Sequence, residues 1–221
     1  MKPVLPIAAL FGLALALPTA AADQKAADQG KGAAAAPAAA APAAPAATAV
    51  CAGCHGPDGN SVIPQNPNLA GQVAQYITKQ LTNFKEADKA TGRKSAIMQG
   101  MVATLTPEDV KALGAYYSAQ PTKGGIATDK ALAEKGEKLW RGGDAQRGIP
   151  ACAGCHSPNG AGIPAQYPRL AGQHADYTAA QLKAFRAGER QNDPNRMMQM
   201  IAVKLNDQDI AALSQYTQGL R

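Results

Sequence analysis

The chain has 221 residues and a mass of 22.6 kDa, which allows one large domain or two small ones. Its formal charge of +6 is not concentrated in a basic stripe with stacking aromatics, and this argues against nucleic-acid binding. With only three Phe and one Trp, and with alanine making up much of the 46% hydrophobic content, a core of side chains alone would be small. We therefore expect a non-protein group to help fill it.

The N-terminus has the pattern of an export signal. Lys2 precedes an apolar run from Val4 to Leu17, and the small residues 18–22 that follow suit signal-peptide cleavage. The run is shorter than the ~20 residues needed to span a bilayer, which argues against the alternative of a retained anchor. We predict a signal peptide over residues 1–22 and a periplasmic location.

Residues 23–48 form an Ala/Pro-rich segment of low complexity, which indicates a semi-extended tether. The remainder of the chain is a repeat. Cys51-Ala52-Gly53-Cys54-His55 recurs 101 residues later as Cys152-Ala153-Gly154-Cys155-His156, and Leu69-Ala70-Gly71-Gln72 recurs at the same offset. The repeat predicts a tandem duplication. Its parts are domain 1 over 49–120, a linker over 121–128 and domain 2 over 129–221.

Each copy is predicted to be helical, since no segment alternates as a strand does. Residues 73–85 place Tyr76, Gln80, Leu81 and Phe84 on one helix face. The next helix follows Thr106 and ends near Ser118, and Asn206 begins its counterpart.

A further helix, from Asp129 to Trp140, precedes the second cysteine motif and should end at Gly142-Gly143. The first motif has Ala/Pro sequence at the equivalent place, unless a short helix begins at Pro45.

The repeated C-x-x-C-H motif is the attachment sequence of a c-type haem. Two thiols bind the haem vinyl groups, and the adjacent histidine is placed to ligate the iron. The predicted attachment cysteines are Cys51, Cys54, Cys152 and Cys155, and the predicted axial histidines are His55 and His156. A zinc ribbon, a thioredoxin-like redox pair and plain disulfides are the alternatives. None of them explains a histidine after both cysteine pairs.

The second axial ligand is predicted from the register of the two copies. At an offset of 100, Met98 aligns with Met198. The methionines without a partner are Met101, Met197 and Met200. His174 aligns with Val73 and is expected to be an exposed helix residue. A thioether favours ferrous iron, and two filled axial positions leave no open site for a substrate. We therefore expect an electron carrier and not an enzyme.

Two further features surround the motifs. Pro67-Asn68-Leu69 and Pro168-Arg169-Leu170 could offer a backbone carbonyl to the axial imidazole N–H. Basic residues precede each predicted methionine ligand, and such runs are usually solvated faces. The alternatives are docking of a partner and pairing with haem propionates. The basic residues are Lys85, Lys89, Arg93, Lys94, Lys183, Arg186, Arg190 and Arg196.

Over about residues 51–221 the sequence resembles the dihaem cytochromes c4, in which two class I cytochrome c domains are fused. The resemblance is carried by the two C-A-G-C-H motifs, both P-x-L-A-G-Q segments and Trp140-Arg141-Gly142-Gly143. It implies an all-α fold with each domain wrapped around one covalent haem c. It also implies that Met98 and Met198 match the family's axial methionines.

The resemblance further implies a periplasmic protein that passes single electrons between respiratory complexes and a terminal oxidase. Its partners would be redox proteins, and any membrane association would arise through their complexes. One alternative is the cytochrome subunit of an oxidoreductase, such as a sulfide or alcohol dehydrogenase. Another is a peroxidase-type enzyme, which would need a haem with a vacant or displaceable ligand.

Overall fold

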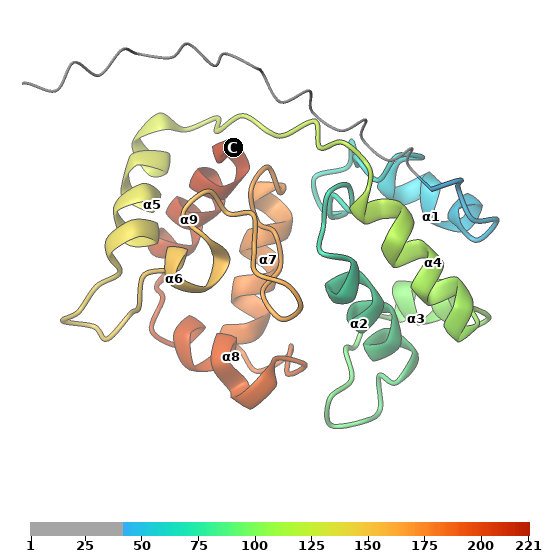
Figure 1. The fold of residues 1–221 in the computed structure, drawn as a ribbon. Helices are drawn as coiled ribbons and strands as arrows, with labels where there is room; N and C mark the ends of the chain where they lie inside the picture. Colours follow the sequence, from blue (N-terminus) through green and yellow to red (C-terminus); the bar gives the residue numbers. More distant parts are fainter. Residues whose placement is uncertain (1–41) are drawn as a thin grey trace, which may run out of the picture. The chain divides into compact units, whose positions relative to one another are not determined.

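The structure is a computed structural model that describes residues 42–221, all of which belong to one compact unit. The predicted signal peptide and most of the predicted tether lie outside these residues. Residues 42–221 form α-helices, one 3-10 turn and two isolated bridges, with no strand (Figure 1). This confirms the predicted helical class. No helix within this range has the length and apolar character to span a bilayer.

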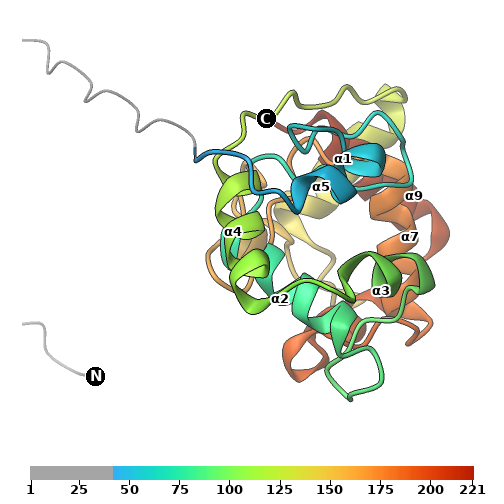
Figure 2. The same cartoon turned by 90° about the vertical axis from the view of Figure 1, so that its right-hand side faces the viewer.

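Domain 1 contains four helices. They are α1 (Thr48–His55), α2 (Ala74–Lys85), α3 (Ala96–Val102) and α4 (Pro107–Ser118). Helix α2 packs against α3 and α4, and it lies alongside α4 in both views (Figures 1 and 2). The core between them includes Leu81, Phe84, Leu113 and Tyr117. The start of α4 is fixed locally by Thr106, whose side chain accepts the N–H of Asp109 in a capping box.

Domain 2 contains five helices. They are α5 (Lys130–Gly142), α6 (Ala153–His156), α7 (Ala175–Arg186), α8 (Met197–Ala202) and α9 (Asp207–Gly219), with a 3-10 turn at Pro194–Arg196 before α8. Helix α9 packs against α5 and α7. Asp129 caps α5 and Asn206 caps α9, as the sequence predicts. Trp140 is buried in the core that these helices enclose.

The two cysteine motifs are approached differently. In domain 2 the long helix α5 precedes the motif and packs on α9. In domain 1 the N–H of Thr48 donates to the Pro45 carbonyl at 2.9 Å, and α1 then carries the motif itself. The suggested short helix beginning at Pro45 is only a turn at residues 46–47, which leads into α1 at Thr48. Within the described residues, domain 1 thus has no separate helix before its motif to match α5.

The repeated Leu-Ala-Gly-Gln segment forms a tight turn under the chain that joins the domains. Gly71 has φ +64°, and its N–H donates to the Tyr117 carbonyl at 2.9 Å. A Cβ at Gly71 would collide with Thr122, and one at Gly172 would lie 2.9 Å from Cα of Gly124. Glycine is needed at both positions because the linker passes directly over them.

Candidate haem sites and the domain interface

The two motif histidines lie at the ends of their helices and are buried, each with 7% of its surface exposed. Nδ1 of His55 is 2.9 Å from the Pro67 carbonyl oxygen, and Nδ1 of His156 is 3.0 Å from that of Pro168. A carbonyl oxygen only accepts, so Nδ1 carries the proton in both rings. The Nε2 lone pair is then left for a metal. The predicted carbonyl partners are confirmed.

Burial also sets the charge state of these groups. It lowers the pKa of both His55 and His156, against the opposing effect of the proline carbonyl bond, and so favours the neutral imidazole that binds metals. Burial raises the pKa of the Cys51 thiol, and it raises the pKa of Cys152 to about 11. At neutral pH these two cysteines are therefore protonated thiols, the form that adds across a vinyl group.

The two predicted methionines lie in short helices. Met98, in α3, is half-buried and packs against the same hydrophobic cluster as Cys51. Met101 is 46% exposed and Met200 is 56% exposed, so they contribute less to the protein interior. Met198 is half-buried in α8. Its neighbour Met197 is half-buried as well, so burial alone does not single out Met198.

Domain 2 has a cleft suited to an apolar group. It has a volume of about 650 Å³ and opens between the loop before Cys152 and helix α8. The residues lining it are mostly apolar and include Ile149, Met200 and Ile201. Of the α8 methionines, Met197 and Met200 line this cleft, whereas the predicted haem-binding residues Cys152, Cys155, His156 and Met198 do not. The cleft therefore lies beside the motif and does not by itself place the haem.

The alternatives to haem gain no support from the geometry. Across residues 42–221, no three His, Cys, Asp or Glu side chains gather into a group that could hold a metal ion. The two cysteine pairs therefore do not meet as a zinc ribbon would require. All four cysteines are free of disulfides.

Two of the basic residues expected on a solvated face are instead buried where the domains meet. Arg93 donates from Nη2 to the Tyr177 hydroxyl at 3.0 Å, and Arg190 donates from Nη2 to the Tyr76 hydroxyl at 2.9 Å. Each guanidinium also lies over the phenylalanine ring of its own domain, at 4.7 and 4.4 Å from the ring centre. The prediction of a solvated face is wrong at these two positions.

The four residues predicted to share one face of the 73–85 helix contact two different surroundings. Leu81 and Phe84 enter the domain core, but Tyr76 and Gln80 accept hydrogen bonds from Arg190 of the other domain. The helix has an apolar face toward its own domain and a polar face toward its neighbour. The matching Tyr and Gln in the second copy were the available sequence signal for this interface.

The buried arginines also test the fit of a haem. In the described part of the chain no carboxylate forms an ion pair with Arg93 or Arg190, although Asp193 favours the charge of Arg190 electrostatically. Buried charges are normally paired. A porphyrin that carries propionate carboxylates would supply the missing anions, so these residues fit the predicted group.

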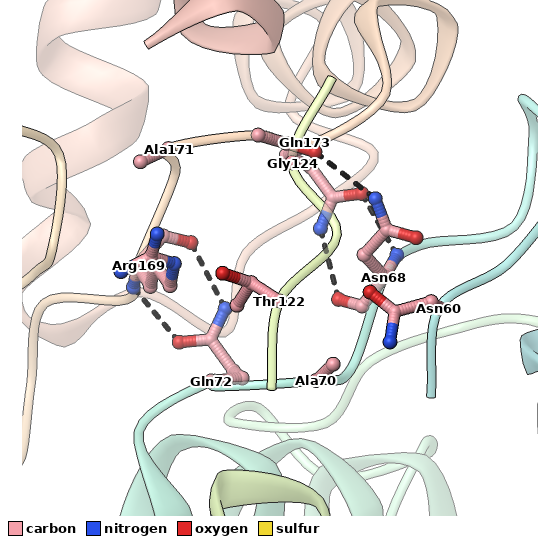
Figure 3. Close-up of a pocket in the computed structure, with 10 residues that line it drawn as sticks. Asn60, Asn68, Ala70, Gln72, Thr122, Gly124, Arg169, Ala171 and Gln173 are labelled. Carbon is pink, nitrogen blue, oxygen red and sulfur yellow. Dashed lines mark hydrogen bonds between the residues drawn. The ribbon is translucent and has the colours of Figure 1, made fainter. Parts of the chain in front are cut away.

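A second set of contacts joins the domains through backbone amides (Figure 3). Oε1 of Gln72 accepts the N–H of Arg169 at 2.8 Å, and Oε1 of Gln173 accepts the N–H of Asn68 at 2.9 Å. The polar pocket beside them has a volume of only about 10 Å³, room for about one water molecule. Sequence analysis missed both glutamines, although their place in the repeated Leu-Ala-Gly-Gln segments marked them.

His174 also belongs to this contact. It is half-buried, and its Nε2 lies 2.9 Å from the Ser61 carbonyl oxygen of domain 1. The expectation that it is an exposed helix residue is wrong, because the adjacent domain covers it. The hydrogen bond to that carbonyl gives Nε2 of His174 a partner within the protein, so this nitrogen does not need a metal.

Comparison with known proteins agrees with this geometry. The Cytochrome c family model matches residues 39–119 and again 133–221. Cytochrome c4 of Azotobacter vinelandii is 51% identical over 175 residues, which cover 76% of this chain and 82% of that protein. A more distant relative, the thiosulfate dehydrogenase electron acceptor of Stutzerimonas stutzeri, is 39% identical and covers 74% of this chain and 75% of its own.

A solved structure matches the fold. The crystal structure of reduced recombinant cytochrome c4 from Pseudomonas stutzeri superimposes with a TM-score of 0.76 at 49% identity, over 79% of this chain and 95% of that one. Two family matches in tandem, each containing one C-x-x-C-H motif, account for the duplication seen in the sequence. The chain therefore belongs to the dihaem cytochrome c4 family, is an electron-transfer cytochrome with two tandem cytochrome c domains, and carries two covalently bound haem c groups.

Proposed function

We propose that the protein is a periplasmic carrier that passes single electrons from respiratory-chain donors to a terminal oxidase. The observation that carries this proposal is the pair of buried histidines, each held by a proline carbonyl so that Nε2 is left to bind iron. The export pattern of residues 1–22 supports the location. The proposed domain bounds are 49–120 and 129–221, with 121–128 as the linker.

The proposed ligand sets are the same in both domains. Cys51 and Cys54 bind the first haem, with His55 and Met98 as axial ligands. In domain 2 the attachment residues are Cys152 and Cys155, and the axial ligands are His156 and Met198. When bound, such a haem supplies a one-electron couple at iron without making or breaking a bond to substrate.

The chain's own residues support this role by restricting change at the iron. The Pro67 and Pro168 carbonyls fix the orientation and tautomer of the imidazoles, so each His side chain remains in place through a redox cycle. A half-buried methionine on the other side would complete the coordination and exclude small molecules. We infer a carrier without enzymatic activity of its own, which exchanges electrons with redox proteins.

The ligand assignment is tested by a haem count combined with the ferric methionine-to-iron charge-transfer band. We expect two haems per chain, and loss of half the band in each of Met98→Ala and Met198→Ala. Met101→Ala and Met197→Ala are matched controls in the same two helices and should keep the full band. If Met197→Ala loses half the band and Met198→Ala keeps it, the assignment in domain 2 is wrong.

The carrier proposal is tested separately with carbon monoxide and peroxide. A ferrous protein with two filled axial positions should not bind carbon monoxide without denaturant, and it should not turn over peroxide. Ready binding of carbon monoxide by the ferrous wild-type protein, or turnover of peroxide, would overturn the proposal and favour a peroxidase-type enzyme.

A second candidate is the electron-accepting partner of a dehydrogenase. It is favoured by the relative whose name describes an electron acceptor for thiosulfate dehydrogenase. Purification of the protein from its native cell extract distinguishes the two candidates. A free carrier should elute alone, whereas a subunit should elute in fixed proportion with a dehydrogenase. Rapid reduction by that dehydrogenase, together with slow oxidation by oxidase-containing membranes, would favour the second candidate.

A further inference from the structure

We infer that Gln72 and Gln173 are positioning residues that act across the domain boundary, each tuning the axial histidine of the opposite domain. The inference rests on the proposed roles of His55 and His156 as iron ligands. Neither glutamine lies in a C-x-x-C-H motif. Both are buried, with 7% and 6% of their surface exposed.

In domain 1 the connection runs through a single peptide group. The carbonyl oxygen of Pro67 accepts the proton of His55 Nδ1 at 2.9 Å. The amide N–H of the same peptide group belongs to Asn68, and it donates to Oε1 of Gln173 at 2.9 Å. One planar peptide therefore stands between the imidazole of domain 1 and a side chain of domain 2.

Domain 2 has the same arrangement in reverse. Nδ1 of His156 donates to the Pro168 carbonyl at 3.0 Å, and the N–H of that peptide group, which belongs to Arg169, donates to Oε1 of Gln72 at 2.8 Å. The residues correspond at the 101-residue offset of the repeat. The contact therefore occurs in both copies of the repeat, once in each direction across the boundary.

Additional bonds fix how each glutamine is turned. Nε2 of Gln173 donates to the Asn68 carbonyl at 3.0 Å, and Nε2 of Gln72 donates to the Arg169 carbonyl at 2.9 Å. Each Oε1 also accepts the N–H of the residue after its own glutamine, His174 or Val73. With both ends of the amide engaged, the acceptor oxygen stays on the peptide N–H (Figure 3).

A chain of this kind has a definite electronic effect. An acceptor on a peptide N–H makes the carbonyl of that peptide a stronger acceptor, because hydrogen bonds in series polarise one another. The stronger carbonyl draws the Nδ1 proton and raises the basicity of the Nε2 that faces the metal. A more basic nitrogen favours the ferric state. Each glutamine should therefore lower the reduction potential of the haem in the other domain.

A purely structural role for the glutamines predicts something else. If they only hold the domains together, removing either one should disturb both haems alike, or chiefly the haem of the domain that contains it. The two roles are distinguished by whether each substitution changes the potential of the haem in the opposite domain. That change can be measured by following the signals of each haem separately, because the two haems belong to different domains.

The experiment uses the holoprotein labelled with ¹⁵N-histidine, and it follows each haem by NMR during a redox titration. Gln173→Leu should raise the potential of the domain 1 haem and weaken the His55 Nδ1–H hydrogen bond, seen as an upfield proton shift. Gln72→Leu should do the same to the domain 2 haem and His156. In each variant the other haem should move less.

Two variants serve as controls. Gln65→Leu removes a different bond between the domains, from Nε2 to Asp176 Oδ2 at 3.3 Å, and should leave both potentials unchanged. Gln173→Glu restores an acceptor oxygen in the same shape. In this variant the reduction potential of the domain 1 haem should equal the wild-type value or lie below it. This holds for a neutral or an ionised carboxyl, because both offer an acceptor oxygen.

The inference is overturned if both Leu variants shift the two haems equally, shift the haem of their own domain, or shift neither. A rise in potential with Gln173→Glu as large as with Gln173→Leu would overturn it too. Failure of the proposed function is seen separately, in the wild type. If His55 and His156 are not iron ligands, their ring ¹⁵N signals in the ferric protein will lack the large paramagnetic shift of coordinated nitrogen.

Discussion

Replacing Gly136 with alanine should destabilise domain 2, although the same change stabilises most helices. Gly136 lies within α5, where that helix crosses α9, and a Cβ there would lie 2.6 Å from the Ala212 carbonyl carbon and 2.7 Å from Cβ of Tyr216. Carbon atoms pack favourably at about 3.5–4 Å, so the helices must separate by roughly 1 Å. Overpacking of this kind costs about 1–3 kcal/mol.

The helix propensity of alanine opposes this loss by about 1 kcal/mol, which leaves a net destabilisation of up to about 2 kcal/mol. For a chain of this size the melting temperature should fall by up to about 8 °C. The melting temperature is measured by far-UV circular dichroism of the holoprotein. Gly142→Ala is the matched control, because it lies in the same helix with open space around its Cα, and it should be neutral or slightly stabilising. A rise in melting temperature for Gly136→Ala would show that α5 and α9 do not approach as closely as described.

Three further changes test other contacts. Trp140→Phe removes the hydrogen bond from the indole N–H to the Pro158 carbonyl at 3.2 Å and part of a buried ring. Urea unfolding should show that the free energy of unfolding falls by about 1–3 kcal/mol. An unchanged unfolding midpoint would contradict the described packing of Trp140. Arg190→Met leaves the half-buried Tyr76 hydroxyl without its donor and removes a contact between the domains. Calorimetry should then show two separated unfolding transitions, and a single unaltered transition would refute a role for Arg190 in coupling the domains. Thr106→Ala removes the N-cap of α4 and should lower the free energy of unfolding by ~1 kcal/mol in the same urea assay. An unchanged free energy of unfolding would show that the cap does not stabilise α4.

The elements that sequence analysis predicts well are those fixed by local chemistry. The start of α4 after Thr106 and the start of α5 after Asp129 follow from side chains that cap the first turn. The C-x-x-C-H spacing likewise fixes where the motif histidines sit. The proline carbonyl that orients each histidine was also predictable, because it follows the motif at the same distance in both copies.

The contacts between domains were not predictable in the same way. Arg93 follows Phe84 by nine residues, whereas Arg190 follows Phe185 by five, so a fixed offset does not align the two arginines. Their equivalence appears only in space, where both cross the boundary to a tyrosine of the other domain. Periodicity also could not separate the two faces of α2, because a buried polar face toward a neighbour and a buried apolar face toward a core both show helical spacing.

The paired glutamine contacts have a consequence for the origin of the chain. Position 72 meets position 169, and their equivalents 173 and 68 meet in the same manner, which is the self-complementary pattern of a twofold homodimer. A single-domain ancestor with this surface could have associated with a second copy of itself before the genes fused. Fusion then holds the two halves at a local concentration that no longer depends on expression level.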